Sequence, residues 1–272
     1  MLIRLGYDIQ FDVQSHVPMV ALLNVHPSRL KDLREPDRLQ VEPHMTGDEY
    51  IDSFGNHCRR FLALPGTLRL SNSTLIEDSG LGDAQNPDAR EIPVEQLPPE
   101  TLQFLLSSRY CEVDLLSNTA VELFGGIAPG FQRVQAICTW INQKVQFGYS
   151  FARSTKTALH VYTERMGVCR DFQHLAITFC RCLNIPARYA TGYLGDIGVP
   201  ASPSPMDFSA WFEAYLDGQW WTFDARHNQS RIGRVLMATG RDAADVAITT
   251  SFGDARLTKF TVVTDEVTEA GS

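Results

Sequence analysis

The sequence predicts an α+β protein, in which a strand-rich first part is followed by helices and then by a second set of strands. Three observations support this fold class. Short apolar and alternating stretches separated by Gly, Pro and Asn turns occupy residues 1–85. Helical periodicity marks residues 129–146 and 169–183. Apolar stretches typical of strands then dominate the remaining chain.

The first module begins with an alternating strand. Between Ile3 and Asp12, apolar side chains occupy every second position, as expected for a half-buried strand. Further strands are expected at 19–25, 58–64 and 67–76, with Pro65-Gly66 as the turn between the last two. Residues 1–85 are therefore predicted to form a β-sandwich or small barrel.

A linker is predicted at 86–100, where Asn86-Pro87, Ile92-Pro93 and Pro98-Pro99 interrupt any regular structure. The second module then covers 101–272. Pro98-Pro99-Glu100 is typical of a helix start, so a helical stretch is expected directly after it.

Two helices and an antiparallel sheet are predicted in the second module. Apolar residues recur at three- and four-residue intervals through 129–146. The helix at 169–183 should stop before Asn184-Ile185-Pro186, because a residue that precedes proline disfavours the helical conformation. Strands are expected to follow at 187–194, 209–216, 219–224 and 259–266.

Composition and charge narrow the classes of function. The net charge of −8 and the pI of about 5.4 argue against nucleic acid or an anionic membrane as the main partner. No stretch approaches the roughly 18 apolar residues of a membrane span, and the N-terminus does not resemble a signal peptide. A cytoplasmic protein with reduced cysteines is expected.

No metal or cofactor is predicted. Cys180 and Cys182 form the only close cysteine pair, and no second pair completes a zinc site. Gly-rich phosphate-binding motifs are also missing from the sequence, which argues against a nucleotide cofactor.

Cys169 is the strongest candidate for a reactive residue. It follows Gly167-Val168 at the start of the predicted helix, where unsatisfied N–H groups and the helix dipole favour a thiolate. The same N–H groups are suited to stabilising an oxyanion.

A hairpin supplies the candidate partners of this cysteine. Asp217-Gly218 is a preferred two-residue turn, and the resulting register pairs Leu216 with Gln219. Continued further, the register places Ser209 and Asp224 on one face as diagonal neighbours, roughly 7–8 Å apart.

These motifs together resemble the bacterial transglutaminase-like superfamily. The resemblance is carried by Gly167-Val168-Cys169-Arg170-Asp171-Phe172, Asn184-Ile185-Pro186-Ala187-Arg188, Thr191-Gly192-Tyr193, Ala210-Trp211-Phe212-Glu213 and Gly218 to Asp224. It implies a papain-like core of helices on an antiparallel sheet behind an N-terminal β-sandwich. It further implies acyl transfer or amide hydrolysis through a thioester, with Cys169 as the nucleophile and Asp224 as the residue that orients an imidazole.

The position that the family fills with histidine is Ser209 here. A serine hydroxyl does not accept a proton from a thiol near neutral pH, so the general base must come from elsewhere. His227, three residues after Asp224, is the nearest histidine, but it reaches the site only if the strand twists or ends. His160 and His174 are further alternatives, and packing roles are expected for both.

Three other residues are candidates for binding. Arg226 lies opposite Ser209 in the predicted register, where its charge would favour a thiolate or where it would pair with Asp224. Trp211 and Trp220 are candidate substrate contacts, although packing of the hairpin is the favoured interpretation for both.

Two hypotheses about function follow. In the first, the protein is a cysteine hydrolase or acyltransferase that acts on a peptide or protein amide. In the second, Ser209 marks a catalytically silent fold that is kept as a peptide- or protein-binding module. The substrate, the choice between hydrolysis and transamidation, and the oligomeric state are not determined by these patterns.

Overall fold

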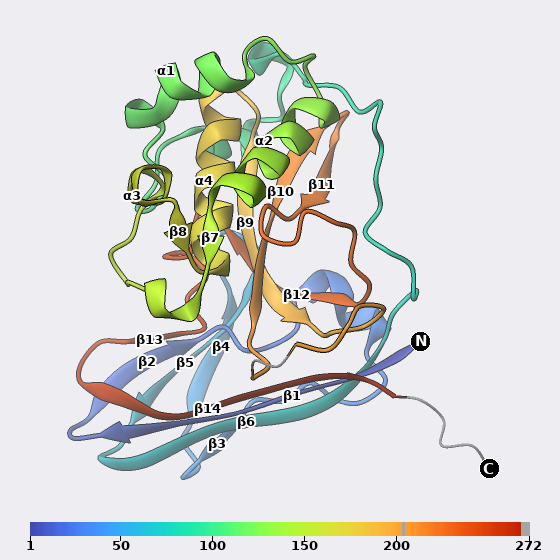
Figure 1. Cartoon of the computed structure of the whole chain (residues 1–272). Coiled ribbons are helices and arrows are strands. Elements are labelled where there is room, and N and C mark those ends of the chain that lie inside the picture. Colours follow the sequence, from blue (N-terminus) through green and yellow to red (C-terminus); the bar gives the residue numbers. More distant parts are fainter. Residues whose placement is uncertain (203–204, 268–272) are drawn as a thin grey trace.

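The computed structural model describes residues 1–202 and 205–267. It contains a β-sandwich at one end and a helical layer packed on a separate sheet at the other (Figure 1). This mixture of helices and antiparallel sheets confirms the α+β class.

The sandwich consists of two four-stranded sheets. The first has the order β14-β1-β6-β3, and the second has the order β13-β2-β5-β4. Their strands are β1 (Leu2–Val13), β2 (Val17–Ala21), β3 (Gln40–Glu42), β4 (Gly47–Ile51), β5 (His57–Ala63), β6 (Gly66–Glu77), β13 (Thr249–Ser251) and β14 (Ala255–Glu266).

Strand β1 shows why the alternating pattern is informative. The apolar side chains from Ile3 to Phe11 that occupy every second position are buried in the sandwich core, whereas most of the intervening ones are only partly buried. The full length of β1 pairs with β6 on one side and with β14 on the other.

The membership of the last strand corrects the sequence analysis. Residues 259–266 were expected in the sheet of the second module, but β14 pairs antiparallel with β1, as Tyr7 opposite Val262 illustrates. Likewise, β13 pairs with β2. The end of the chain thus returns to the sandwich and completes both of its sheets, as Figure 1 shows.

The second module contains a four-stranded sheet of order β11-β10-β9-β12. Its strands are β9 (Ala187–Leu194), β10 (Ser209–Leu216), β11 (Gln219–Phe223) and β12 (Arg234–Gly240). Its helices are α1 (Val113–Phe124), α2 (Phe131–Lys144), α3 (Ala158–Glu164) and α4 (Cys169–Cys182), and β7 (Gln146–Phe147) and β8 (Met166–Gly167) form a short parallel pair beside them.

Helix α4 is the central element of this module. It packs against β9 and β10 on one side and is surrounded by α1, α2 and α3 (Figure 1). Its residues from Asp171 to Arg181 are all buried. The stretch that was expected to be helical after Pro98 forms only a short 3-10 helix, Pro99–Leu105, and Leu106 after it is exposed.

The predicted linker is held firmly against the second module. Ala89 is buried and its carbonyl accepts a hydrogen bond from the Phe131 N–H at the start of α2 (2.9 Å). Glu91 forms a salt bridge with Arg133 (3.0 Å). The segment therefore wraps around the fold and contributes contacts to it.

The described residues contain no helix that is long and apolar enough to cross a membrane. The cytoplasmic location expected from the sequence stays a prediction.

Candidate active site

Cys169 is the first residue of α4, as the sequence indicates. The helix start is fixed by Asp171, whose Oδ2 accepts a hydrogen bond from the N–H of Val168 (3.0 Å). This carboxylate at the third helical position satisfies one of the free N–H groups and places negative charge near the positive end of the helix dipole. The Arg170 N–H lies beside the Cys169 sulfur and favours its anionic form.

The thiol of Cys169 is protonated at neutral pH in the absence of substrate. Burial raises its pKa to about 11, and Asp207 contributes in the same direction. The positive charge of Arg226 and the Arg170 N–H lower the pKa but do not outweigh burial. A nucleophilic role for this thiol therefore requires a base that takes its proton.

The hairpin has the register that the turn predicts, with Leu216 opposite Gln219 and Phe212 opposite Phe223. Strand β11 ends at Phe223, however, and the pairing does not extend to Asp224. The chain turns there, because the Asp224 carboxylate accepts hydrogen bonds from the N–H groups of Arg226 (2.9 Å) and His227 (3.1 Å).

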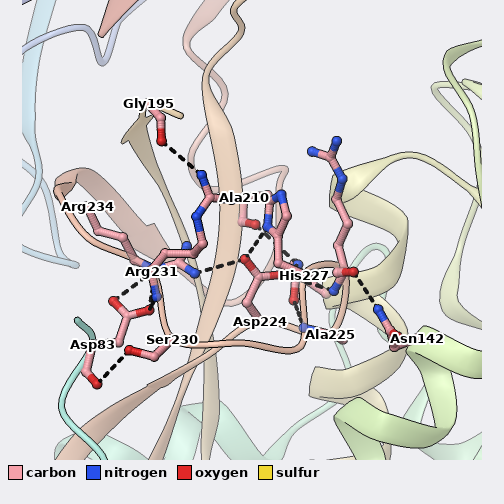
Figure 2. Close-up of polar contacts among 12 residues, drawn as sticks. Asp83, Asn142, Gly195, Ala210, Asp224, Ala225, His227, Ser230, Arg231 and Arg234 are labelled. Atoms are coloured by element: carbon pink, nitrogen blue, oxygen red, sulfur yellow. Dashed lines mark hydrogen bonds and ion pairs between the residues drawn. The ribbon is translucent and has the colours of Figure 1, made fainter. Parts of the chain in front are cut away.

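This turn places the imidazole of His227 next to the Asp224 carboxylate. Its Nδ1 lies 2.9 Å from Asp224 Oδ2 (Figure 2). A carboxylate accepts only, so Nδ1 carries the hydrogen and Nε2 is left as the nitrogen that can accept a proton. Burial tends to raise the pKa of Asp224, but the hydrogen bond from His227 and the charge of Arg234 hold it below its usual value.

Two residues that the sequence did not reveal hold Asp224 in place. Gln173, one helical turn after Cys169, donates from Nε2 to Asp224 Oδ1 (3.0 Å) and accepts the N–H of Ala225 (3.1 Å). Arg234 on β12 donates from Nη2 to Asp224 Oδ2 (2.9 Å). Neither lies in a recognisable motif, because both are brought to the aspartate by tertiary packing.

Arg234 is itself anchored by the segment after β6. Its Nε lies 2.9 Å from Asp83 Oδ2, so the guanidinium bridges two carboxylates, Asp83 and Asp224 (Figure 2). Asp83 also accepts the N–H of Arg231 (2.9 Å). A chain of charged hydrogen bonds thus leads from Asp83 through Arg234 and Asp224 to the imidazole of His227.

Cys169 lies where two cavities meet. The smaller one, of about 100 Å³, is lined by Cys169, Ser209, Arg226 and His227 among others. The larger one, of about 620 Å³, is also lined by Cys169 and is bounded by apolar side chains that include Ala243, Ala244 and Ala247. Asp207 and Ser209 line both cavities.

The structure brings most of the predicted site residues together. Cys169, Ser209, Arg226 and His227 line one cavity, and Asp224 lies directly behind His227. The Arg226 guanidinium lies 3.8 Å from the centre of the Phe147 ring. Asp224 forms its salt bridge with Arg234, and not with Arg226, for which this pairing was one of the two roles considered.

The two tryptophans lie away from these cavities. Trp211 is 2% exposed, and its ring faces the guanidinium of Arg234 at 5.1 Å. Trp220 packs on Phe104 and Tyr215. A packing role accounts for both rings, because β10 and β11 direct them into the interior and toward the turn end of the hairpin.

The other two histidines have structural partners. The imidazole Nδ1 of His160 accepts the N–H of Thr157 (3.2 Å) and thereby caps α3. His174 is fully buried on α4, stacked on Tyr110, and its Nε2 accepts the N–H of Ala243 (3.1 Å). Neither residue lines a cavity with Cys169.

Comparison with known proteins identifies the family of this chain. The transglutaminase-like superfamily model matches residues 117–225, which include Cys169 and Asp224. The crystal structure of a "putative cysteine protease" from Cytophaga hutchinsonii aligns over 100% of this chain and 92% of its own, with 33% identity and a TM-score of 0.85. The chain belongs to the transglutaminase-like superfamily.

Two further proteins are similar to this transglutaminase-like chain. An uncharacterised protein of Mycobacterium leprae is 27% identical over 225 residues, which are 78% of this chain and 77% of that protein. The periplasmic domain of TgpA from Pseudomonas aeruginosa aligns over 82% of this chain and 88% of its own, at 14% identity and a TM-score of 0.42.

The site of this transglutaminase-like protein contains the groups needed for acyl transfer. It offers a thiol at a helix start, an imidazole with one free nitrogen, a carboxylate that orients the imidazole, and backbone N–H groups next to the sulfur. Among residues 1–202 and 205–267, no cluster of His, Cys, Asp and Glu side chains has the composition of a metal site.

Proposed function

We propose that this protein is a cysteine acyl-transfer enzyme that acts on a peptide or protein amide through a thioester on Cys169. The observation that carries the proposal is the contact of 2.9 Å between His227 Nδ1 and Asp224 Oδ2, on the wall of the cavity that also contains Cys169. His227 then replaces the histidine that the family places at the position of Ser209.

The reaction begins with proton transfer from the Cys169 thiol to Nε2 of His227 as the sulfur attacks the carbonyl carbon of the amide. Because burial raises the pKa of the thiol to about 11, this transfer must accompany the attack. The oxygen of the tetrahedral intermediate takes up negative charge near the Arg170 N–H. Asp224 stabilises the imidazolium that forms.

The C–N bond of the amide then breaks, and the leaving amine takes the proton from His227. The acyl group stays on Cys169 as a thioester. Water or a second amine attacks the thioester carbon and gives its proton to His227. Finally the C–S bond breaks, and the sulfur recovers that proton as the acid or the new amide leaves.

Two lines of support favour amides as substrates. The larger cavity beside Cys169 has room for several residues of an extended peptide. The similar protein from Cytophaga hutchinsonii, which is 33% identical, is described as a "putative cysteine protease". Since neither observation distinguishes water from an amine as acceptor, hydrolysis and transamidation belong to one proposal.

The first experiment tests the proposed base. Release of p-nitroaniline from short peptide p-nitroanilides should disappear in Cys169→Ala and fall about 10²- to 10⁴-fold in His227→Ala, the usual size of a general-base effect. His44→Ala, on the exposed surface of the sandwich, is the matched control and should keep full activity. Adding Ser209→His to His227→Ala should restore part of the activity.

The second experiment tests the nucleophile itself. Iodoacetamide should alkylate Cys169 of the wild type faster at pH 7 than it alkylates the same cysteine in His227→Ala, because only the wild type has an imidazole to take the proton. Equal rates in the two proteins would contradict the role of His227.

The alternative is a silent fold that binds peptides, and Ser209 is the observation that favours it. In that case wild-type protein releases no p-nitroaniline, Ser209→His creates the activity, and Cys169→Ala leaves peptide binding unchanged. Wild-type hydrolysis that depends on Cys169 would exclude this alternative.

A further inference from the structure

Asp207 is an unpaired carboxylate next to the candidate nucleophile. It precedes β10, is half-buried, and lines both cavities that meet at Cys169. In the described part of the chain its side chain has no salt bridge, and the hydrogen-bonding group beside it is the N–H of Phe208. Its negative charge acts on Cys169 and on Tyr149.

The other carboxylate of these cavities is already satisfied. Asp196 accepts the N–H of Ser202 (2.7 Å) and lies 3.8 Å from the guanidinium of Arg231. The positive charge of Arg226 lowers the pKa of Asp207, but its guanidinium lies over the ring of Phe147. Among the described residues, Asp207 therefore offers a carboxylate that no cation of the protein contacts in a salt bridge.

We propose that Asp207 binds a primary ammonium group of the substrate, so that the enzyme selects peptides with a free amino group close to the amide that reacts. This inference rests on the proposed function and adds the substrate class to it. An ammonium group fits the observations because it supplies both the charge and the hydrogen-bond donors that Asp207 lacks. The neighbouring wall at Ala243, Ala244 and Ala247 has small side chains, which leave room for the acyl residue beside Cys169.

Binding of the ammonium group would also activate the nucleophile. Burial raises the pKa of Asp207, and the Asp207 charge raises the pKa of the Cys169 thiol, so each ionised group disfavours the other. A bound cation offsets both effects, because it stabilises the carboxylate and screens its charge from the sulfur. Substrate binding and formation of the thiolate are thereby coupled.

The main test compares donors that differ only in the charge of the amino group. Wild-type enzyme should hydrolyse alanyl p-nitroanilide with a kcat/KM about tenfold or more above that of N-acetylalanyl p-nitroanilide, the ratio expected for one charged hydrogen bond. In Asp207→Asn this ratio should fall to about one. N-acetyl-lysyl p-nitroanilide shows whether a side-chain ammonium replaces the terminal one.

The matched control is Asp196→Asn, which removes the paired carboxylate of the same cavity and should leave the preference for the free amine intact. If Asp207→Asn lowers kcat/KM for both donors by the same factor, Asp207 serves only to balance the charge of Arg226 and the proposal is wrong. A wild type without preference among the three donors also overturns it, while leaving the proposed thioester chemistry intact.

A second readout does not depend on turnover. Propylammonium chloride, compared with equal sodium chloride, should raise the rate of Cys169 alkylation in the wild type at about pH 8, where the probe is protonated. Asp207→Asn alone should be alkylated faster than the wild type at this pH and should not respond to propylammonium. The same response in both proteins would rule out Asp207 as the ammonium site, even if no amide is hydrolysed.

Discussion

At the scale of single residues, Asp224 is the centre on which the candidate site depends. Its two oxygens accept hydrogen bonds from the side chains of Gln173, His227 and Arg234 and from two backbone N–H groups. These donors hold the carboxylate ionised although it is buried. A carboxylate held so firmly can fix the orientation of His227 within narrow limits.

Arg234 provides a test of this network. Arg234→Met leaves Asp83 and Asp224 without their shared cation, so the free energy of unfolding should fall by about 3–5 kcal/mol, the usual cost of breaking a buried ion pair. The charge of Arg234 also lowers the pKa of Asp224, so without it the carboxylate that orients His227 becomes protonated at higher pH. The acid limb of the pH profile of kcat/KM should therefore move to higher pH.

Urea unfolding and the pH profile measure these two effects. Arg234→Lys is the control, since it keeps the charge but not the two-pronged geometry, and both of its effects should be smaller. A methionine variant with an unchanged profile would mean that Arg234 supports the fold without influencing the base.

At the scale of elements, the hairpin shows how far the sequence leads. Asp217-Gly218 fixes the turn and hence the pairing of Leu216 with Gln219, and both were predictable from local residue types. The end of β11 was not predictable. At Asp224 the pairing between the two strands stops, because the carboxylate accepts hydrogen bonds from the N–H groups of the turn that follows it. The pattern of apolar residues does not indicate where the strand ends, and the position of His227 depends on the turn that begins there.

The remaining differences have a similar cause. Helix α4 and strands β9 and β10 have the predicted limits to within a residue, since strong periodicity and a following proline or glycine mark them. The pattern of β14 indicates a strand, but alternation does not specify which sheet the strand joins. Gln173 and Arg234 were missed as site residues because only tertiary contacts bring them to Asp224, and Asp207 was missed because no motif marks it as a neighbour of Cys169.

Helix α4 also supports one wall of the larger cavity, and this support should depend on pH. Burial lowers the pKa of His174 well below its usual value, with Arg170 and Arg181 acting in the same direction. The neutral ring accepts the N–H of Ala243, and a protonated ring would lose that hydrogen bond. A depressed pKa stabilises the fold above the unfolded pKa of about 6.5, and the effect is lost as the pH falls below it.

The variant His174→Phe isolates this effect. It should lower the free energy of unfolding at pH 7.5 by about 1–3 kcal/mol, because the Ala243 N–H loses its acceptor. Between pH 6.5 and 5.0 the wild type should lose up to about 1.4 kcal/mol per pH unit more than the variant does. Urea unfolding at three pH values provides the comparison, and parallel pH slopes would contradict the buried neutral imidazole.

At the scale of the whole molecule, the two modules share their hydrophobic cores. Tyr193 on β9, Val235 on β12 and Phe208 before β10 belong to the cluster that fills the sandwich. Leu22 and Cys58 from the sandwich belong in turn to the cluster around α4. Together with the return of β14 to β1, this mixing makes separate unfolding of either module costly.

We therefore expect a single cooperative unfolding transition, although chains of this length often unfold domain by domain. Fluorescence of the four tryptophans, all located between residues 140 and 221, reports on the second module. Hydrogen exchange of β6 peptides, followed at increasing urea concentrations, reports on the sandwich. The two midpoints should coincide. Phe208→Ala should lower the free energy of unfolding by about 3–5 kcal/mol, because a buried ring is lost, and should move both urea midpoints down together. If β6 exchanges at a lower urea concentration than the one at which the tryptophan signal changes, the shared core does not couple the two modules.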